Sequence, residues 1–83
     1  MALIVPPHVA RQFASMPRAD AERLRNRLDR IAENPMAPHA GISPMTGAPG
    51  QYRVRQGDWR AIYAVKGGDV ILGSVGHRRE VYR

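Results

Sequence analysis

Arginine, histidine and tyrosine side chains in the second half of the chain have the types and the spacing to do chemistry. Three arginines, Arg53, Arg55 and Arg60, interrupt the strand-like stretch QYRVRQGDWRAIYAV at 51–65. The stretch GHRREVYR at 76–83 then adds a second group: His77, Arg78, Arg79 and Tyr82. Guanidinium groups suit phosphate, and histidine exchanges a proton near neutral pH. We therefore expect this half of the chain to face a polyanion.

This set of side chains suits metal-free cleavage of RNA. The substrate's own 2′-OH attacks the adjacent phosphate, so the protein needs no nucleophile. It must accept one proton, donate another and stabilise a phosphorane that carries additional negative charge. We expect Arg60 to hold the scissile phosphate. We expect Arg78 to support the charge on the leaving oxygen or to act as the acid that protonates it. Further phosphate contacts are assigned to Arg53, Arg55 and Arg79.

The proton acceptor must be chosen from the remaining groups, because arginine has a pKa above about 12 and is effectively never deprotonated. His77 is the first candidate for the base and Tyr82 the second. Each has a plainer interpretation: His77 could be a surface residue at a strand end, and Tyr82 could anchor the C-terminus against the core. Tyr82 could also bind RNA by stacking on a nucleobase. Arginines on a solvated sheet face are likewise ordinary.

Two tight turns set the register of the strands that carry these residues. Gly57-Asp58 and Gly67-Gly68 suit primed hairpin turns between strand-like runs at 51–56, 59–66 and 69–77. The first turn predicts the pairs Gln56–Trp59, Arg55–Arg60, Arg53–Ile62 and Tyr52–Tyr63. The second predicts Lys66–Asp69, Ile62–Gly73 and Arg60–Val75.

Because side chains alternate between faces and opposite residues share one, this register predicts two unlike faces. One is an apolar layer for packing on helices: Tyr52, Val54, Trp59, Ala61, Tyr63, Val65, Val70 and Leu72. The other gathers the cations around a glycine gap: Arg53, Arg55, Arg60, Ile62, Gly73, Val75 and His77. Arg55 beside Arg60 should destabilise the hairpin, and a phosphodiester between them would turn repulsion into attraction.

The first half of the chain supplies the elements that must position this sheet. The run ALIV at 2–5 predicts a short buried strand. Apolar residues at helical spacing then predict two helices around Pro17, with Val9, Phe13 and Met16 before it and Ala21, Leu24, Leu28 and Ile31 after it. Asn34-Pro35 ends the second helix, and residues 35–50, rich in proline and glycine, predict a connector with one short extended piece near Ile42.

These elements predict one α+β domain, residues 1–83: an N-terminal strand, a two-helix hairpin, then an antiparallel sheet of three to four strands packed on the helices. The formal net charge of +6 is carried by arginine with a single lysine. Cysteine is absent, the three histidines lack metal-ligand spacing, and no glycine-rich nucleotide loop occurs, so we expect neither metal nor cofactor. The first residues hold no signal peptide or membrane segment, and we expect a cytoplasmic protein.

Two motifs of the second half resemble the RelE/ParE superfamily of bacterial toxins, on the RelE side. The first runs from Tyr52 to Tyr63 (YRVRQGDWRAIY) and the second from Val75 to Tyr82 (VGHRREVY). The resemblance extends more weakly over the first strand, both helices and the ENP at 33–35, so it covers nearly the whole chain. It implies a sheet in which the first strand lies beside the last.

The resemblance also implies an activity, partners and site residues. It implies a toxin of a type II toxin–antitoxin system that cleaves mRNA at the ribosomal A site and is held inactive by a cognate antitoxin. The family's basic strand residues carry over to Arg53 and Arg55, its phosphate-contacting arginine to Arg60, and its C-terminal basic residue and tyrosine to Arg78 and Tyr82. Well-known members have lysines at the first pair, so the arginines here favour His77 as the base.

Two other functions stay open from the sequence. The ParE branch shares the fold and inhibits DNA gyrase by protein binding, generally without this catalytic set. A plain RNA-binding module without toxicity is the third reading.

Overall fold

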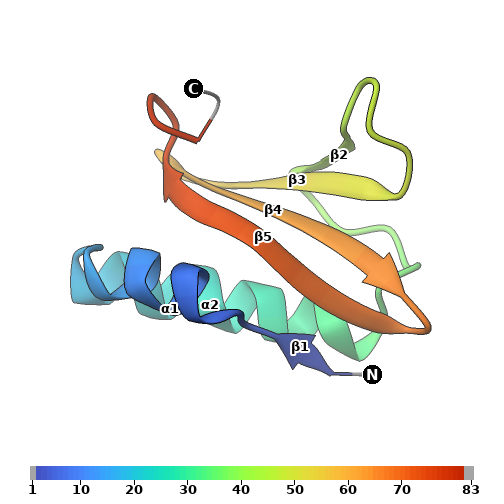
Figure 1. Cartoon of the computed structure of the whole chain (residues 1–83), viewed down its shortest axis with the longest axis horizontal. Coiled ribbons are helices and arrows are strands. Elements are labelled where there is room, and N and C mark those ends of the chain that lie inside the picture. Colours follow the sequence, from blue (N-terminus) through green and yellow to red (C-terminus); the bar gives the residue numbers. More distant parts are fainter. Residues whose placement is uncertain (1, 82–83) are drawn as a thin grey trace.

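The computed structural model describes residues 2–81, in which two helices lie against one face of a five-stranded sheet (Figure 1). The strands are β1 (Leu3–Ile4), β2 (Ile42–Pro44), β3 (Gln51–Gln56), β4 (Trp59–Lys66) and β5 (Asp69–His77), and the helices are α1 (Pro7–Ala14) and α2 (Arg18–Glu33). The sheet order is β1-β5-β4-β3-β2. The predicted α+β class, the order of the elements and the first strand beside the last are confirmed.

The antiparallel part of the sheet has four strands, β2 to β5, within the predicted three to four. The extended piece near Ile42 is β2, which pairs antiparallel with β3, and β1 pairs parallel with β5. The sheet is therefore mixed. No helix among residues 2–81 is long and apolar enough to cross a membrane.

Prolines delimit both helices. Pro7 occupies the first turn of α1, where its missing N–H costs nothing, and α2 begins directly after Pro17. Asn34, before Pro35, ends α2 with extended rather than helical backbone angles. The tight turn around Pro17 thus leaves the two helices on the same side of the sheet (Figure 1), and the buried residues of both helices belong to the core.

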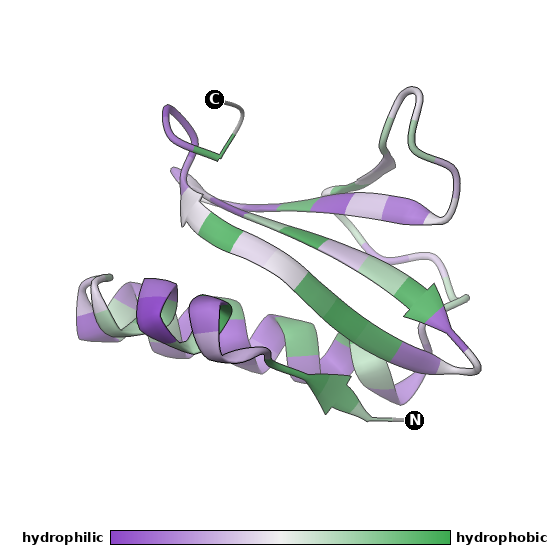
Figure 2. Ribbon diagram, viewed as in Figure 1, coloured by the Kyte–Doolittle hydropathy of each residue, from purple (hydrophilic) through white to green (hydrophobic). Residues whose placement is uncertain are grey.

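The core lies between this helical layer and the sheet. Leu24, Leu28 and Ile31 of α2 are at most 1% exposed, and Val54 and Ala61 meet them from the sheet at 0%. Hydrophobic and hydrophilic residues alternate along β3, as a strand with one buried face requires (Figure 2). Tyr63 stacks on Tyr52 with ring centroids 5.5 Å apart, and burial, followed by the neighbouring Tyr52, raises the pKa of Tyr63 to about 12.

The register of the β3–β4 hairpin is as predicted. The register of the β4–β5 hairpin agrees with the prediction only as far as Leu72. Gln56–Trp59, Arg55–Arg60, Arg53–Ile62 and Tyr52–Tyr63 pair, as do Lys66 and Asp69. Beyond Leu72, a β-bulge inserts one additional residue, Gly73, into β5. The predicted pairs Ile62–Gly73 and Arg60–Val75 are therefore wrong, because Ile62 faces Ser74 and Arg60 faces Gly76.

The bulge has a physical reason in Val75. A regular strand would turn this valine to the uncovered face, whereas the additional residue turns it inward, opposite Ala61 and 3% exposed. Glycine suits a bulge, where one residue is left without a cross-strand partner. The bulge carbonyl is not left unpaired, because His8 Nε2 of α1 donates to Gly73 O at 2.8 Å.

The same helix protects the exposed edge of β5. Strand β1 pairs with Val70 and Ile71, and within residues 2–81 the rest of β5 has no strand neighbour on that side. Gln12, one turn after His8, accepts the Val75 N–H through Oε1 at 2.9 Å. Side chains of α1 thus satisfy backbone groups that would otherwise be open to another strand.

Candidate nucleic-acid interface

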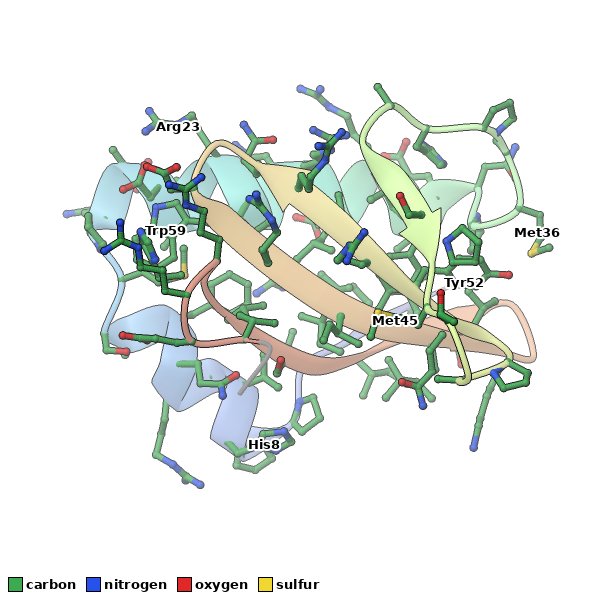
Figure 3. All side chains as sticks on the ribbon, turned by 90° about the horizontal axis from the view of Figure 1, so that it is seen from above. His8, Arg23, Met36, Met45, Tyr52 and Trp59 are labelled. Carbon is green, nitrogen blue, oxygen red and sulfur yellow. The ribbon has the colours of Figure 1, made fainter. Side chains whose placement is uncertain are left out.

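The face of the sheet that the helices leave uncovered carries Arg53, Arg55 and Arg60. The alternation of β3 turns Val54 to the helices and the two arginines beside it to the opposite side. Arg60 is the direct cross-strand partner of Arg55, so it lies on that same side. The expectation that these three arginines share one face is confirmed. Figure 3 looks onto this face, across which no helix passes.

Arg60 is half-buried and is held against the hairpin turn. Its Nη1 donates to Gly57 O at 2.7 Å and to Trp59 O at 2.9 Å. Both acceptors are neutral carbonyls, so the charge of the guanidinium is not cancelled. Within residues 2–81, no carboxylate lies at ion-pair distance from Arg60 or from Arg55. Two unneutralised cations therefore stand opposite each other.

Nothing on β5 crowds this pair from the other side. Gly76 is the cross-strand partner of Arg60 and has no side chain. Ser74, which faces Ile62, is the next residue of β5 on the same face. The glycine gap that the sequence predicted is therefore present, but it is formed by Gly76 rather than by Gly73.

The turn after β5 brings Arg78 to the same end of the sheet. Arg78 N donates to Asp58 O at 2.8 Å, and its Nε lies 3.8 Å from Asp58 Oδ1. The N–H groups of Glu80 and Val81 both bond His77 O. The C-terminal turn is thus fastened to the β3–β4 turn, and it rises beyond the end of β5 on the side away from the helices (Figure 1).

The last described residue of the C-terminal turn, Val81, packs against Gly76 of β5. A Cβ added at Gly76 would lie 3.1 Å from Val81 Cγ2, so the glycine allows the chain to pass close above it. Gly76 is the cross-strand partner of Arg60, and Val81 also lines a hollow at the free edge of β5 together with Gln12 and Met16 of α1. Tyr82 follows Val81 but lies outside the described residues. Arg79 is exposed on the same turn.

His77 does not share the arginine face, and this prediction is wrong. The bulge at Gly73 shifts the alternation, so His77 pairs with Trp59 on the helix side. The two rings meet edge to face with centroids 5.5 Å apart. His77 Nδ1 accepts the Arg79 N–H at 3.3 Å, which places the proton of the neutral ring on Nε2. In this arrangement the imidazole supports the C-terminal turn.

Sequence reasoning missed Asp58 and the two α1 side chains at the β5 edge. Asp58 anchors Arg78, and the only signal for this was its place in the Gly57-Asp58 turn. His8 and Gln12 gave a weaker signal, namely their spacing of one helical turn. No group of three or more histidine, cysteine, aspartate or glutamate side chains within residues 2–81 is arranged to hold a metal ion.

Several solved structures to which the chain is similar are toxins or toxin–antitoxin complexes. The chain is similar to the RelB–RelE antitoxin–toxin complex from Methanococcus jannaschii, at 19% identity over 99% of this chain and 95% of that one, with a TM-score of 0.78. It is similar to a double arginine-to-alanine mutant of E. coli toxin RelE in the free state, at 20% identity over 96% and 85%, also with a TM-score of 0.78. The archaeal RelE–RelB complex from Pyrococcus horikoshii OT3 matches at 22% identity over 96% of each chain, with a TM-score of 0.75.

These likenesses define the fold as that of the RelE-type toxins. The family model described as the ParE toxin of the type II toxin–antitoxin system parDE matches residues 5–82. The chain therefore belongs to the ParE toxin family of type II toxin–antitoxin systems, within the RelE/ParE superfamily. No curated protein sequence matches it.

Replacing Arg55 with glutamate should stabilise the free protein. Arg55→Glu converts the like-charge pair with Arg60 into an opposite-charge pair, worth about 0.2–1 kcal/mol across a hairpin. We expect a higher melting temperature at low salt, and a smaller gain at high salt because exposed charges are screened. The matched control is Arg53→Glu, since Arg53 lies opposite Ile62 on β4 and Ser43 on β2, neither of which carries a charge. Equal or lower stability of Arg55→Glu at low salt would contradict the repulsion.

Proposed function

We propose that this protein is a metal-independent endoribonuclease that cleaves mRNA on the ribosome, as the toxin of a toxin–antitoxin pair. One observation carries the proposal: Arg55 stands opposite Arg60 on an uncovered face, without a neutralising carboxylate at ion-pair distance in the described chain. A protein that only needed a stable hairpin would gain by avoiding this pair. A phosphodiester placed between the two guanidinium groups accounts for it.

The reaction we propose uses the substrate's own nucleophile. The 2′-oxygen bonds to the adjacent phosphorus as its proton passes to a base, and the bond from phosphorus to the 5′-oxygen breaks as that oxygen gains a proton. The products are a 2′,3′-cyclic phosphate and a 5′-hydroxyl. Arg60, with Arg53 and Arg55, stabilises the charge that accumulates on the phosphorane oxygens. Arg78 supports the leaving oxygen, and Arg79 binds a flanking phosphate.

The position of Arg60 suits this role. Its two carbonyl partners fix the guanidinium at the hairpin end without neutralising it. A fixed cation needs little reorganisation when charge develops on the substrate. In the described part of the chain the acceptors of Arg60 are neutral carbonyls, so a phosphate that displaces one of them forms a charge-assisted bond in place of a weaker one.

For the proton acceptor, we propose Tyr82 in place of His77. His77 lies on the helix side and its Nδ1 is engaged by the Arg79 N–H. It acts as a positioning residue for the turn that carries Arg78 and Arg79. Val81 packs against Gly76, whose cross-strand partner is Arg60, and Tyr82 is the residue after Val81.

The partners follow from the same reaction. An antitoxin with acidic residues would neutralise the arginine face, and several similar structures are toxin–antitoxin complexes. The ribosome would present the mRNA, so the site of action is the cytoplasm. A second candidate function, inhibition of DNA gyrase by protein binding, is favoured by the ParE description of the matching family model.

The two functions separate on the fate of mRNA in cells. Expression of the wild type should produce mRNA ends in phase with codons, and Arg60→Ala should lower cleavage by about 10²–10³-fold, the usual loss when one donor to a developing anion is removed. Mapping RNA ends after induction measures this. Arg18→Ala is the control, because that side chain is 93% exposed on α2.

The opposite pattern would replace the first function with the second. Intact mRNA together with double-strand DNA breaks would identify gyrase as the target. Full mRNA cleavage by a folded Arg60→Ala variant would remove Arg60 from the mechanism.

His77 should behave as a positioning residue. His77→Asn keeps an acceptor close to the position of Nδ1 for the Arg79 N–H, whereas His77→Leu removes it. We expect the asparagine variant to retain cleavage within about 3-fold of wild type and the leucine variant to lose about 10-fold or more. Tyr82→Phe should lose about 10²-fold or more, as removal of a general base does. If His77→Asn loses as much as Tyr82→Phe, His77 is the base after all. Cleavage of ribosome-bound mRNA by purified variants is the measurement.

A further inference from the structure

A second cluster of arginines lies on α2, outside the site described above. Arg23, Arg27 and Arg30, with Asn26, follow one another at helical spacings of three and four residues, so they form one stripe along the helix. This stripe lines a hollow of about 420 Å³ together with His39, Ala40 and Gln56. Among the residues that the structure describes, no acidic side chain lines this hollow. Like charges at these spacings destabilise a helix, so the stripe is unfavourable unless something compensates it.

Arg27 is held in place at the floor of this hollow, which we call the α2 pocket. Its Nη1 donates to Gln56 Oε1 at 3.1 Å. Gly41 lies against the same guanidinium, since a Cβ there would lie 2.8 Å from Arg27 Nη2. Gly41 also has a φ of +74°, which L side chains rarely adopt. The glycine therefore makes room for an arginine in a fixed position.

Arg23 and Arg30 form the accessible rim of the α2 pocket. Arg23 Nη2 bonds Asp20 Oδ1 at 2.6 Å, and Arg30 is exposed without an ion-pair partner among residues 2–81. His39 Nε2 donates to Asn34 O at 2.9 Å, which fixes that ring at the opposite wall. The pocket thus combines one fixed cation, two adaptable cations and amide groups, a set that suits phosphate oxygens.

The α2 pocket joins the arginine face around the edge of β3. Gly41 O accepts the Arg55 N–H at 3.1 Å, so the wall of the pocket is bonded to the strand that carries Arg55. Gln56, the next residue, points into the pocket, while Arg55 points to the uncovered face. Figure 3, which looks onto that face, shows Arg23 projecting beyond the outline of the sheet. A single strand lying on the face can therefore continue into the pocket.

We propose that the α2 pocket binds backbone phosphates of the same RNA, beyond the segment held by Arg53, Arg55 and Arg60. This inference rests on the proposed function. It adds a second anchoring point, whose contribution depends on the length of the RNA. It predicts that short substrates bind through the arginine face alone and that longer ones gain affinity through Arg23, Arg27 and Arg30.

The test uses two uncleavable 2′-O-methyl oligonucleotides, one of about 4 and one of about 16 nucleotides. The variant is Arg23→Gln with Arg30→Gln, which spares the structural Arg27. The matched control is Arg11→Gln with Arg18→Gln. Each pair removes two charges, of which one belongs to an exposed ion pair, Arg23–Asp20 or Arg18–Glu22. Melting temperatures of both variants verify that they are folded.

For the long oligonucleotide, we expect the pocket variant to bind about 5–10-fold more weakly than wild type near physiological salt. The slope of log affinity against log salt should fall by about 1.4, because each lost contact to a single strand removes about 0.7. Binding of the short oligonucleotide should stay unchanged, and the control variant should stay within about 2-fold of wild type for both. Equal losses in the two variants would overturn the inference, since they would reflect net charge alone.

Two further outcomes are distinguishable from that failure. If polyglutamate binds the wild type, and the pocket variant weakens this binding as much as it weakens RNA binding, the assignment to RNA is overturned in favour of an acidic protein segment. If Arg55→Gln with Arg60→Gln leaves binding of the short oligonucleotide unchanged, the proposed function fails, and the inference fails with it.

Discussion

The pair formed by Arg55 and Arg60 is the constraint on which the rest of the structure depends. Two cations directly opposite each other across a hairpin repel, and a substitution of either one should relieve the strain. Within residues 2–81, no carboxylate lies at ion-pair distance from either one, and Arg60 is bonded to two carbonyl oxygens of its own hairpin. The Arg55–Arg60 pair thus lowers the stability of the β3–β4 hairpin. Natural proteins usually depart from the most stable arrangement at functional sites.

The bulge at Gly73 lets β5 supply both a core residue and an open position beside the arginine face. Without the additional residue, Val75 would lie among the arginines and the core would lose a buried side chain. With it, Gly76 comes to face Arg60, and Val81 can pass closely above that glycine. One inserted residue therefore buries a valine and places a glycine opposite Arg60, where Val81 packs against it.

Much of the fold followed from local patterns in the sequence. The prolines at 7, 17 and 35 delimit the helices, and the Gly57-Asp58 turn fixes the β3–β4 register to the residue, so the shared face of Arg53, Arg55 and Arg60 was predictable. The bulge was not, because its cause is the packing of Val75 and the contact of His8 with Gly73, which join residues far apart in the chain. The wrong face was predicted for His77 because the bulge shifts the register of β5 by one residue. Tyr82 remains a prediction from the sequence.

The most direct measurement of the central claim is a crystal structure of the protein with an uncleavable RNA dinucleotide. The account predicts a phosphate between the side chains of Arg55 and Arg60, with Arg53 beside it and at least one carbonyl contact of Arg60 exchanged for a phosphate oxygen. A dinucleotide bound elsewhere, with Arg60 still on Gly57 O and Trp59 O, would contradict the account.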